Sequence, residues 1–479
     1  MNDRDLPRMA EALEKIWEVG QSLGLDPYPI HFEVVPASIM YEVGAYGIPG
    51  RFSHWTHGKA YHQLKMMYDY GLSRIYELVI NTDPSYAFLA EGNSLTQNRM
   101  VAAHVLAHVD FFKHNAYFEQ TNRRMVDLAS VNADRIRKYE FQHGRVEVES
   151  FLDAVLSIQE HVDPNVHIRR QSAEELEEKH REREAKAKRH YQEPTPYDDL
   201  FELDPVPASS GGQREPPAKF PEEPERDLLL FIAENAEGLQ DWQRDVIRIV
   251  RTEMLYFLPQ MQTKILNEGW ATYWHLRIMR ELDLTEDEYI EFAELHANVA
   301  MPSRRQLNPY FVGLKLLEDI ERRWDNPTEE EQRRYGRRPG QGRQKLFEVR
   351  EMESDASFIR NYLTRDLVND LDLYIYRQEG DQLVVVEKDW ERIRNALTRS
   401  LASMGIPYIT VDDADYHHAR ELYLKHLYEG EELDIAYAER TLRHVFILWG
   451  RPVHLETVVD GNRVVLSYDG EKNERAVVK

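Results

Sequence analysis

The chain contains no cysteine and no long run of apolar residues. The absence of cysteine excludes disulfides, thiolate zinc fingers and cysteine nucleophiles. A membrane-spanning helix needs about 18 or more consecutive apolar residues, so we expect no membrane insertion. The N-terminal stretch MNDRDLPRMAEALEKIWEVG begins with charges and lacks the apolar core of a signal peptide. We therefore expect a cytoplasmic protein.

Positive charge is also scarce. The 479 residues include 84 Asp and Glu against 60 Lys and Arg, which gives a net charge of −24. Proteins that bind nucleic acid place clustered Lys and Arg against the phosphates. The densest basic stretch, residues 181–189, is interleaved with Glu and is typical of a solvated helix. The sequence therefore predicts no nucleic-acid partner and no tight complex with duplex DNA at physiological salt.

The composition changes along the chain in a way that predicts its domains. A chain of this length is expected to form two or three domains. Charges are nearly continuous over 171–189, and proline, serine and glycine accumulate over 193–225. We interpret 171–225 as a charged helix followed by a flexible linker or insertion, most open to proteolysis over 193–225. The remaining ranges are a main domain over 1–170 and 226–330, a connecting segment over 331–364, and a small α/β domain over 365–479.

The fold class predicted from apolar patterns is α+β. The main domain is expected to be mostly helical with a small sheet, in an order that resembles zinc hydrolases, where strands precede the ligand helix. The C-terminal domain is expected to combine strands and helices. Paired strands are expected over 73–81 and 86–89. Helices are expected over 125–163, with a break near 143–144, over 227–258, where Pro259 follows, and over 416–429. A hairpin is expected over 453–468.

The stretch from residue 104 to 122, HVLAHVDFFKHNAYFEQTN, contains no glycine or proline and predicts one helix. His104 and His108 are one turn apart, so both imidazoles leave the same face of that helix. Histidines at i and i+4 present two nitrogens to one metal ion. The same stripe continues, at about 3.6 residues per turn, through Phe111, Asn115, Glu119 and Asn122.

The position after His104 departs from the usual pattern of zinc hydrolases. Those enzymes write this spacing as H-E-x-x-H, with the glutamate as general base, whereas this chain has Val105 there. The histidine pair alone is therefore also compatible with a hydrogen-bonded helix interface that holds no metal.

A second stretch, residues 267–275 (NEGWATYWH), adds a candidate third ligand. Its Asn-Glu-Gly-aromatic-Ala sequence resembles the ligand helix of the gluzincin aminopeptidases, which implies that Glu268 completes a His-His-Glu set. His275 follows two turns later on the same face. The alternative is a buried aromatic helix with Gly269 at a close helix crossing. Together the two stretches predict that His104, His108 and Glu268 hold one divalent metal, with zinc as the first choice.

A turn at residues 46–50 leads into a loop rich in Arg, His, Trp and Lys. Loops on a rigid scaffold often carry function, so Arg51, His54 and Lys59 are candidates for binding an anionic or carbonyl oxygen of a substrate. A buried aromatic loop with charged rims is an equally good interpretation of the same residues.

Several longer motifs lie between residues 30 and 320. They are Tyr41-Glu42-Val43, Ala45-Tyr46-Gly47, Arg51-Phe52-Ser53-His54-Trp55, Gly58-Lys59, Tyr76-Glu77-Leu78-Val79-Ile80-Asn81, the His104 helix, 267–275 and Asn308-Pro309-Tyr310. These motifs resemble the stage V sporulation protein R (SpoVR) family over most of that range. The resemblance implies a role in forming the spore cortex, a peptidoglycan layer, or a more general envelope or stress role. It also implies an association with a serine protein kinase.

Two hypotheses follow for the function. In the first, the protein is a metal-dependent hydrolase acting on an amide bond of a peptidoglycan-like substrate, and another residue replaces the missing base. Candidate catalytic residues are then Glu91 and Glu119 as the base, with Asp110 as a weaker candidate for that role. His275 or His296 is a candidate extra ligand or acid, and Asn115 is a further candidate substrate contact. In the second, the polar helix face is a satisfied buried network of a regulatory or scaffold protein, whose C-terminal domain binds a partner.

Overall fold

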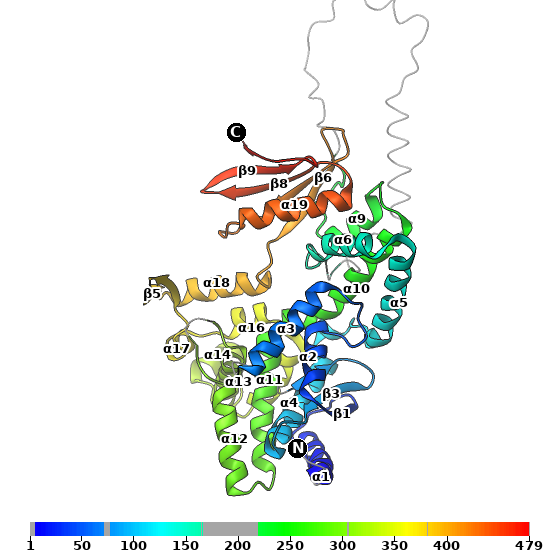
Figure 1. Ribbon diagram of the computed structural model, residues 1–479. Helices are drawn as coiled ribbons and strands as arrows, with labels where there is room; N and C mark the ends of the chain where they lie inside the picture. The colour runs from blue at the N-terminus through cyan, green and yellow to red at the C-terminus, as the bar shows by residue number, and fades with distance from the viewer. Residues whose placement is uncertain are drawn as a thin grey trace, which may run out of the picture. The chain divides into compact units, whose positions relative to one another are not determined.

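The computed structural model describes residues 5–70, 77–163, 165, 219–303, 306–380 and 382–478. Most of the charged helix and linker predicted over 171–225 lies outside these ranges, as do the first residues of the strand predicted over 73–81. Within the described residues, no helix has both the length and the apolarity needed to span a bilayer. The chain divides into two compact units, unit 1 (Met1–Asp153 and Arg248–Pro407) and unit 2 (Ala154–Ile247 and Tyr408–Lys479) (Figure 1).

Unit 1 is mostly helical and contains two small sheets. Its helices are α1 (Asp5–Ser22), α2 (Ala37–Tyr46), α3 (Trp55–Asp69), α4 (Leu95–His114), α5 (Met125–His143), α11 (Lys264–Glu281), α12 (Glu286–Val299), α13 (Pro309–Asp325), α14 (Glu329–Tyr335), α15 (Gly342–Met352), α16 (Asp355–Tyr362), α17 (Arg365–Asp370) and α18 (Trp390–Ala402). Its strands are β1 (Ile30–Val35), β2 (Glu77–Ile80), β3 (Ser85–Ala90), β4 (Ile375–Glu379) and β5 (Gln382–Glu387). Two further helices, α6 (Arg145–Leu156) and α10 (Asp241–Gln262), contain a boundary between the units.

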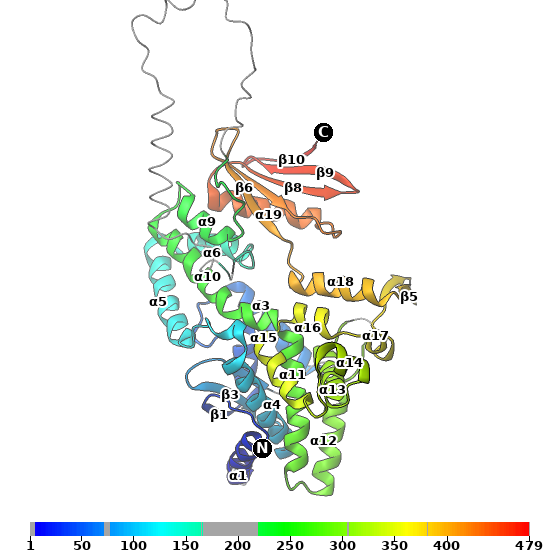
Figure 2. The ribbon, with the colours of Figure 1, turned by 180° about the vertical axis from the view of Figure 1, so that it is seen from behind.

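Helix α4 lies at the centre of unit 1. It packs against α1, α11 and α12 and also contacts β2 and β3 (Figure 2). The sheet beside it has the order β1-β3-β2, with β1 parallel and β2 antiparallel to β3, which confirms the predicted pairing of the second and third strands. The helix begins with a capping box between Ser94 and Gln97, which satisfies two free backbone N–H groups. Its middle is buried on every side, from Met100 to Phe112.

Helix α11 crosses α13 at very short range. A Cβ placed on Gly269 would lie 2.5 Å from the backbone of Gly313, and a Cβ on Gly313 would collide with the backbone of α11. Only glycine at both positions allows the two helices to approach so closely. The close helix crossing at Gly269, which the sequence offered as an alternative interpretation of this stretch, is therefore present.

The predicted helix over 104–122 ends earlier than expected. Helix α4 stops at His114, and Asn115 adopts an extended conformation with φ −77° and ψ 129°. Its side chain is the reason, because Oδ1 accepts from the Tyr117 N–H while Nδ2 donates to the carbonyls of Arg350 and Glu353. Asparagine competes for backbone hydrogen bonds in this way and ends helices. The stripe through Asn115, Glu119 and Asn122 is therefore not continuous with the histidine face.

Two other helix predictions need correction. The helix expected over 227–258 is split into α9 (Leu228–Asn235) and α10, and Pro259 lies inside α10 instead of ending it. Proline removes one donor from the ladder, and Thr263 Oγ1 donates to the Pro259 carbonyl just before α11 begins. The break predicted near 143–144 is correct, since α5 ends there and Gly144 has φ +97°.

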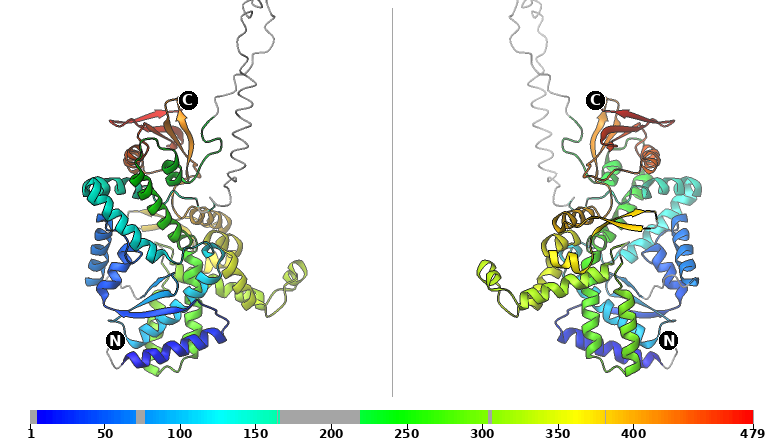
Figure 3. Two further views of the ribbon diagram at one scale, coloured as in Figure 1. Left: turned by 90° about the vertical axis from the view of Figure 1, so that its right-hand side faces the viewer. Right: turned by 90° about the vertical axis from the view of Figure 1, so that its left-hand side faces the viewer.

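Unit 2 contains a five-stranded sheet with the order β10-β9-β8-β7-β6. Helix α19 (Ile435–Trp449) packs on β8 and β9 and is seen against one face of the sheet in Figure 3. The hairpin predicted over 453–468 is correct. The helix predicted over 416–429 is wrong, because that range contains β7, whose side chains alternate between half-buried and buried. The strands are β6 (Ile409–Tyr416), β7 (Glu421–His426), β8 (Val453–Val459), β9 (Asn462–Tyr468) and β10 (Asn473–Val477).

The units divide the chain at different points from the ranges expected from composition. The β4–β5 hairpin and α18 belong to unit 1, since α18 packs on α16, so the C-terminal unit begins near residue 408 and not 365. Residues 219–247 belong with the C-terminal sheet instead of the main domain. The physical reason is a short antiparallel bridge between Glu225 and Val411, together with the stacking of Phe231 on Trp449.

Candidate metal centre

Three buried side chains meet between α4 and α11. His104 and His108 come from the centre of α4, and Glu268 comes from the second turn of α11. Each is no more than 5% exposed, and one ligand atom from each lies within 4.8 Å of the others. The Nε2 atoms of His104 and His108 lie 3.3 and 3.4 Å from the same oxygen, Glu268 Oε2. These three side chains form a group that could bind a metal, as the spacing of the two motifs predicts.

The hydrogen bonds of His108 indicate which of its two ring nitrogens carries the proton. His108 Nδ1 lies 2.9 Å from Asn267 Oδ1, and an amide oxygen only accepts, so Nδ1 carries the proton. In a neutral ring, Nε2 is then a lone pair that faces the Glu268 carboxylate. Two acceptors in contact repel each other unless a cation lies between them. The cation is either a second proton on His108 or a metal ion.

His104 is held by a chain of imidazoles. Its Nδ1 lies 2.9 Å from His275 Nδ1, and His275 Nε2 lies 3.2 Å from His296 Nδ1. Burial holds the pKa of His275 well below its usual value, so this ring is neutral. A neutral imidazole donates one hydrogen bond through one ring nitrogen and accepts one through the other. If His104 donates to His275, its Nε2 is a lone pair and can bind a metal. Such outer partners orient the ligands of metal sites.

The charge on Glu268 is strongly favoured. Burial opposes its ionisation, but a protonated His108, the hydrogen bond with His104 and the Lys264 ammonium outweigh burial and hold the pKa well below its usual value. Lys264 Nζ lies 2.5 Å from Oε1, the oxygen that does not face the histidines. A negative carboxylate with one oxygen directed at two imidazole nitrogens is the state that a metal ligand requires.

This candidate metal-ligand group, His104, His108 and Glu268, opens onto a cavity of about 930 Å³. His108, Asn267 and Glu268 line it, together with Lys264 and Asp355. Asp355 begins α16 and accepts hydrogen bonds from the first backbone N–H groups of α11, those of Ile265 at 2.8 Å and Leu266 at 2.9 Å. Burial outweighs these bonds and raises the pKa of Asp355 to about 7. Neither Lys264 nor Asp355 was expected from the sequence.

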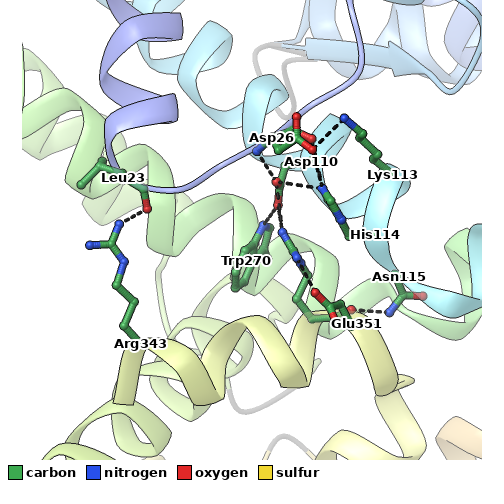
Figure 4. Close-up of polar contacts among 10 residues, drawn as sticks. Leu23, Asp26, Asp110, Lys113, His114, Asn115, Trp270, Arg343 and Glu351 are labelled. Atoms are coloured by element: carbon green, nitrogen blue, oxygen red, sulfur yellow. Dashed lines mark hydrogen bonds and ion pairs between the residues drawn. The ribbon is translucent and has the colours of Figure 1, made fainter. Parts of the chain in front are cut away.

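The other predicted catalytic residues lie elsewhere. Glu91 and Glu119 are exposed, and neither lines the cavity. His296 is half-buried and reaches the centre through His275. Asp110, the weakest candidate, is fully buried in a separate network, where it accepts from Trp270 Nε1 at 3.0 Å (Figure 4). The catalytic roles of the first three stay predictions.

The candidate substrate-binding residues also lie away from the cavity lining. Arg51 Nε donates to the fully buried Glu253 at 2.6 Å, and His54 caps the first turn of α3. Lys59 is exposed, and the side chain of Asn115 is occupied by the backbone of α15 and the residues after it. These are the contacts of a buried loop with charged rims. A substrate role for the four residues stays a prediction.

Comparison with known proteins assigns the chain to one protein family. The family described as "SpoVR like protein" matches residues 3–406, and "SpoVR-like C-terminal domain" matches residues 407–460. The chain therefore belongs to the SpoVR family. Among curated proteins it is 30% identical to "Uncharacterized protein YcgB" of Escherichia coli (strain K12), over 93% of this chain and 90% of that protein. No solved structure matches, so the expected likeness to zinc hydrolases has no support from a structural relative.

Proposed function

We propose that this SpoVR-family chain is a metal-dependent hydrolase in which His104, His108 and Glu268 hold one zinc ion. The observation that carries the proposal is the hydrogen bonding of His108, whose Nε2 faces a carboxylate while Nδ1 donates to Asn267. Two imidazoles and one carboxylate leave a fourth position of a tetrahedral site for water or substrate. When bound, zinc supplies a Lewis acid that lowers the pKa of a water ligand to about 7.

The general base must differ from that of the usual H-E-x-x-H enzymes, since Val105 is fully buried where their glutamate stands. Asp355 is a second carboxylate in the lining of the cavity, besides Glu268. Its pKa of about 7 lies where a general base works best at neutral pH. Asp355 therefore joins Glu91, Glu119 and His296 as a candidate.

The reaction that we propose is the hydrolysis of an amide bond in cell-envelope or spore-cortex metabolism, with a peptidoglycan-like molecule as the substrate. The support for this substrate comes from the resemblance to the sporulation family. A cytoplasmic site of action would favour an envelope precursor over the finished wall. An association with a serine protein kinase belongs to the same proposal.

Elemental analysis of the purified chain tests the metal centre. We expect about one zinc per chain after loading and desalting, and a loss of that zinc in His108→Ala and Glu268→Ala. His426→Ala is a matched control, because His426 is a buried histidine of unit 2 that pairs with Thr457. Circular dichroism checks that each variant is folded. A folded wild type that takes up no zinc, manganese or iron overturns the proposal.

A scaffold or regulatory protein is the second candidate function. One observation favours it: Lys264 already pairs with Glu268 Oε1, so a doubly protonated His108 would complete a buried ion-pair network without any metal. In that case His108→Ala leaves Glu268 buried beside fewer cations and destabilises the fold, whereas added zinc does not change the stability of the wild type.

A further inference from the structure

The cavity beside the metal-ligand group has two chemically different parts. The first part is polar and contains His108, Asn267, Glu268, Lys264 and Asp355, of which His108 contacts Asn267 and Glu268, and Lys264 pairs with Glu268. Most of the remaining lining is apolar and comes from six different elements or their flanks. It includes Phe112 of α4, Phe257 and Met261 of α10, Leu307 before α13, Leu401 of α18 and Met404 after it.

The size and the position of the other polar groups indicate where a ligand would lie. A volume of about 930 Å³ is at the upper end of the range of small-molecule sites, which is roughly 300–1,000 Å³. Gln306 and Ser400 also line the cavity, and both are exposed, so they belong to its rim. A peptide backbone laid along the apolar wall would leave its N–H and C=O groups without partners, which costs free energy. A hydrocarbon chain loses nothing there and gains from burial.

The charge at the polar end favours an anion once a divalent metal is bound. The ion contributes +2 and Lys264 contributes +1, whereas Glu268 and Asp355 contribute −1 each, so the sum is +1. Protonation of Asp355 makes the sum more positive. A carboxylate is the simplest group that both accepts from a lysine and binds a zinc ion.

We infer that the cavity binds the acyl part of the substrate, a carboxylic acid derivative with a long apolar chain. The inference rests on the proposed function and narrows it to amides whose acyl side is apolar. Hydrolysis consumes one water: the C–N bond breaks, the water oxygen bonds to the acyl carbon, and the products are a carboxylic acid and an amine. The carboxylate product lies with its charged end at Lys264 and the metal ligands, and its chain lies along Phe257, Met261 and Leu401.

Calorimetric titration of the full-length protein with dodecanoate tests the inference. The protein is first loaded with zinc and desalted, and its zinc content is measured on the same sample. Dodecylamine has the same chain with the opposite charge, and butyrate has the same charge with a short chain. We expect dodecanoate to bind the loaded protein at least tenfold more tightly than either of the other two probes.

Variants test the contributions of the apolar wall and of the charged end to dodecanoate binding separately. Met261→Gln and Leu401→Gln place an amide on the wall and should each weaken dodecanoate at least fivefold. The matched control is Met352→Gln, which changes a methionine that is 70% exposed. Lys264→Met should reduce the preference for dodecanoate over dodecylamine at least fivefold, whereas Lys15→Met, on an exposed lysine of α1, should leave it unchanged.

The outcomes distinguish this inference from the proposed function. A chain that holds zinc but binds dodecanoate no better than dodecylamine overturns the inference and leaves the metal centre intact. Equal effects of the wall variants and Met352→Gln also overturn it. A chain that holds no zinc overturns the proposed function itself, and with it the positive charge on which the inference depends.

Discussion

Two buried polar clusters lie on opposite sides of the contact between α4 and α11. One contains His108 and Glu268. The other contains Asp110 and Trp270, each two residues further along its helix and therefore about 200° round the axis. The second cluster is closed by Arg350 of α15, whose Nη1 donates to Asp110. Figure 4 shows Asp110 and Trp270 of this cluster.

The clusters differ in their balance of donors and acceptors. Asp110 is 0% exposed and receives donors at both oxygens: the Asp26 N–H at 2.8 Å, Trp270 Nε1 at 3.0 Å, and Arg350 Nη1 at 3.1 and 2.9 Å. Every strong acceptor there has a donor, and the negative charge has a buried guanidinium beside it. At Glu268 Oε2, by contrast, the nearest groups are two imidazole nitrogens, and that of His108 is a lone pair whenever its ring is neutral. A closed network holds helices together, whereas an acceptor-rich group calls for a cation.

Breaking the closed network should give the largest loss of stability. Asp110→Asn removes the negative charge and leaves Arg350 buried with a weaker partner, so we expect unit 1 to lose about 3 kcal/mol. Urea unfolding followed by tryptophan fluorescence measures this change. Asp134→Asn, in an exposed pair with Arg137, should change stability by no more than about 0.5 kcal/mol.

The zinc content of the same variant tests whether the two clusters are independent of each other. Folded Asp110→Asn should retain zinc, because none of the three metal-ligand side chains contacts Asp110 through the hydrogen bonds described above. Loss of zinc from this variant, while its helical content is unchanged, would mean that the two clusters act as one.

Asp355 should make stability depend on pH. Its pKa is raised to about 7 by burial, so the folded chain binds this proton more tightly than the unfolded chain does. The stability contributed by the protonated form is full below pH 4 and is lost as the pH rises toward 7. Asp355→Asn removes this titration and keeps an acceptor for the α11 N–H groups.

We expect the wild type to lose about 2 kcal/mol more than Asp355→Asn between pH 5 and pH 8. The measurement is urea unfolding of both proteins at the two pH values, with a chelator present so that metal binding does not contribute. Parallel pH profiles for the two proteins would contradict a raised pKa at this position.

The outer partner of His108 should have a smaller effect. Asn267→Ala removes the acceptor that orients the ring, and we expect zinc affinity to fall about tenfold. Competition with a chromophoric zinc chelator measures the affinity. Asn326→Ala changes the residue that caps the C-terminal end of α13 and should have no effect on zinc. An unchanged affinity in Asn267→Ala would show that His108 does not bind metal through Nε2.

The smallest expected effect has the opposite sign. Lys264 competes with a metal for the charge of Glu268, so Lys264→Met should bind zinc about threefold more tightly. The same chelator competition detects this change, with Lys15→Met as the control. Weaker zinc binding in Lys264→Met would instead assign the lysine a supporting role at the centre.

The sequence indicates the metal-ligand group more completely than it indicates the surroundings. His104 and His108 follow from helical spacing alone, and Glu268 follows from a short motif. Asp355 lies on another helix with no recognisable spacing to Glu268, and only the packing of α16 against α11 brings it to the cavity. Lys264 could have been found, since it stands one turn before Glu268 on the same helix.

The errors in secondary structure have local causes. Asn115 ends α4 through its own side-chain hydrogen bonds, which apolar periodicity does not detect. Strand β7 is visible in the alternation of Leu422, Leu424 and His426, all buried on one face, a pattern that the helix prediction over 416–429 does not include. Pro259 lies inside α10 instead of ending it, and Thr263 Oγ1 donates to the Pro259 carbonyl.

The crossing of α11 and α13 limits how this protein can vary. Gly269 is the neighbour of Glu268, and Gly313 lies against it from a helix that supplies no metal ligand. A side chain at position 313 would force α11 and α13 apart and shift Glu268 relative to the two histidines without changing any of these three residues. Mutational tolerance at Gly313 should therefore be as low as at the three candidate ligands, and an alanine there would resemble a loss of the candidate metal site.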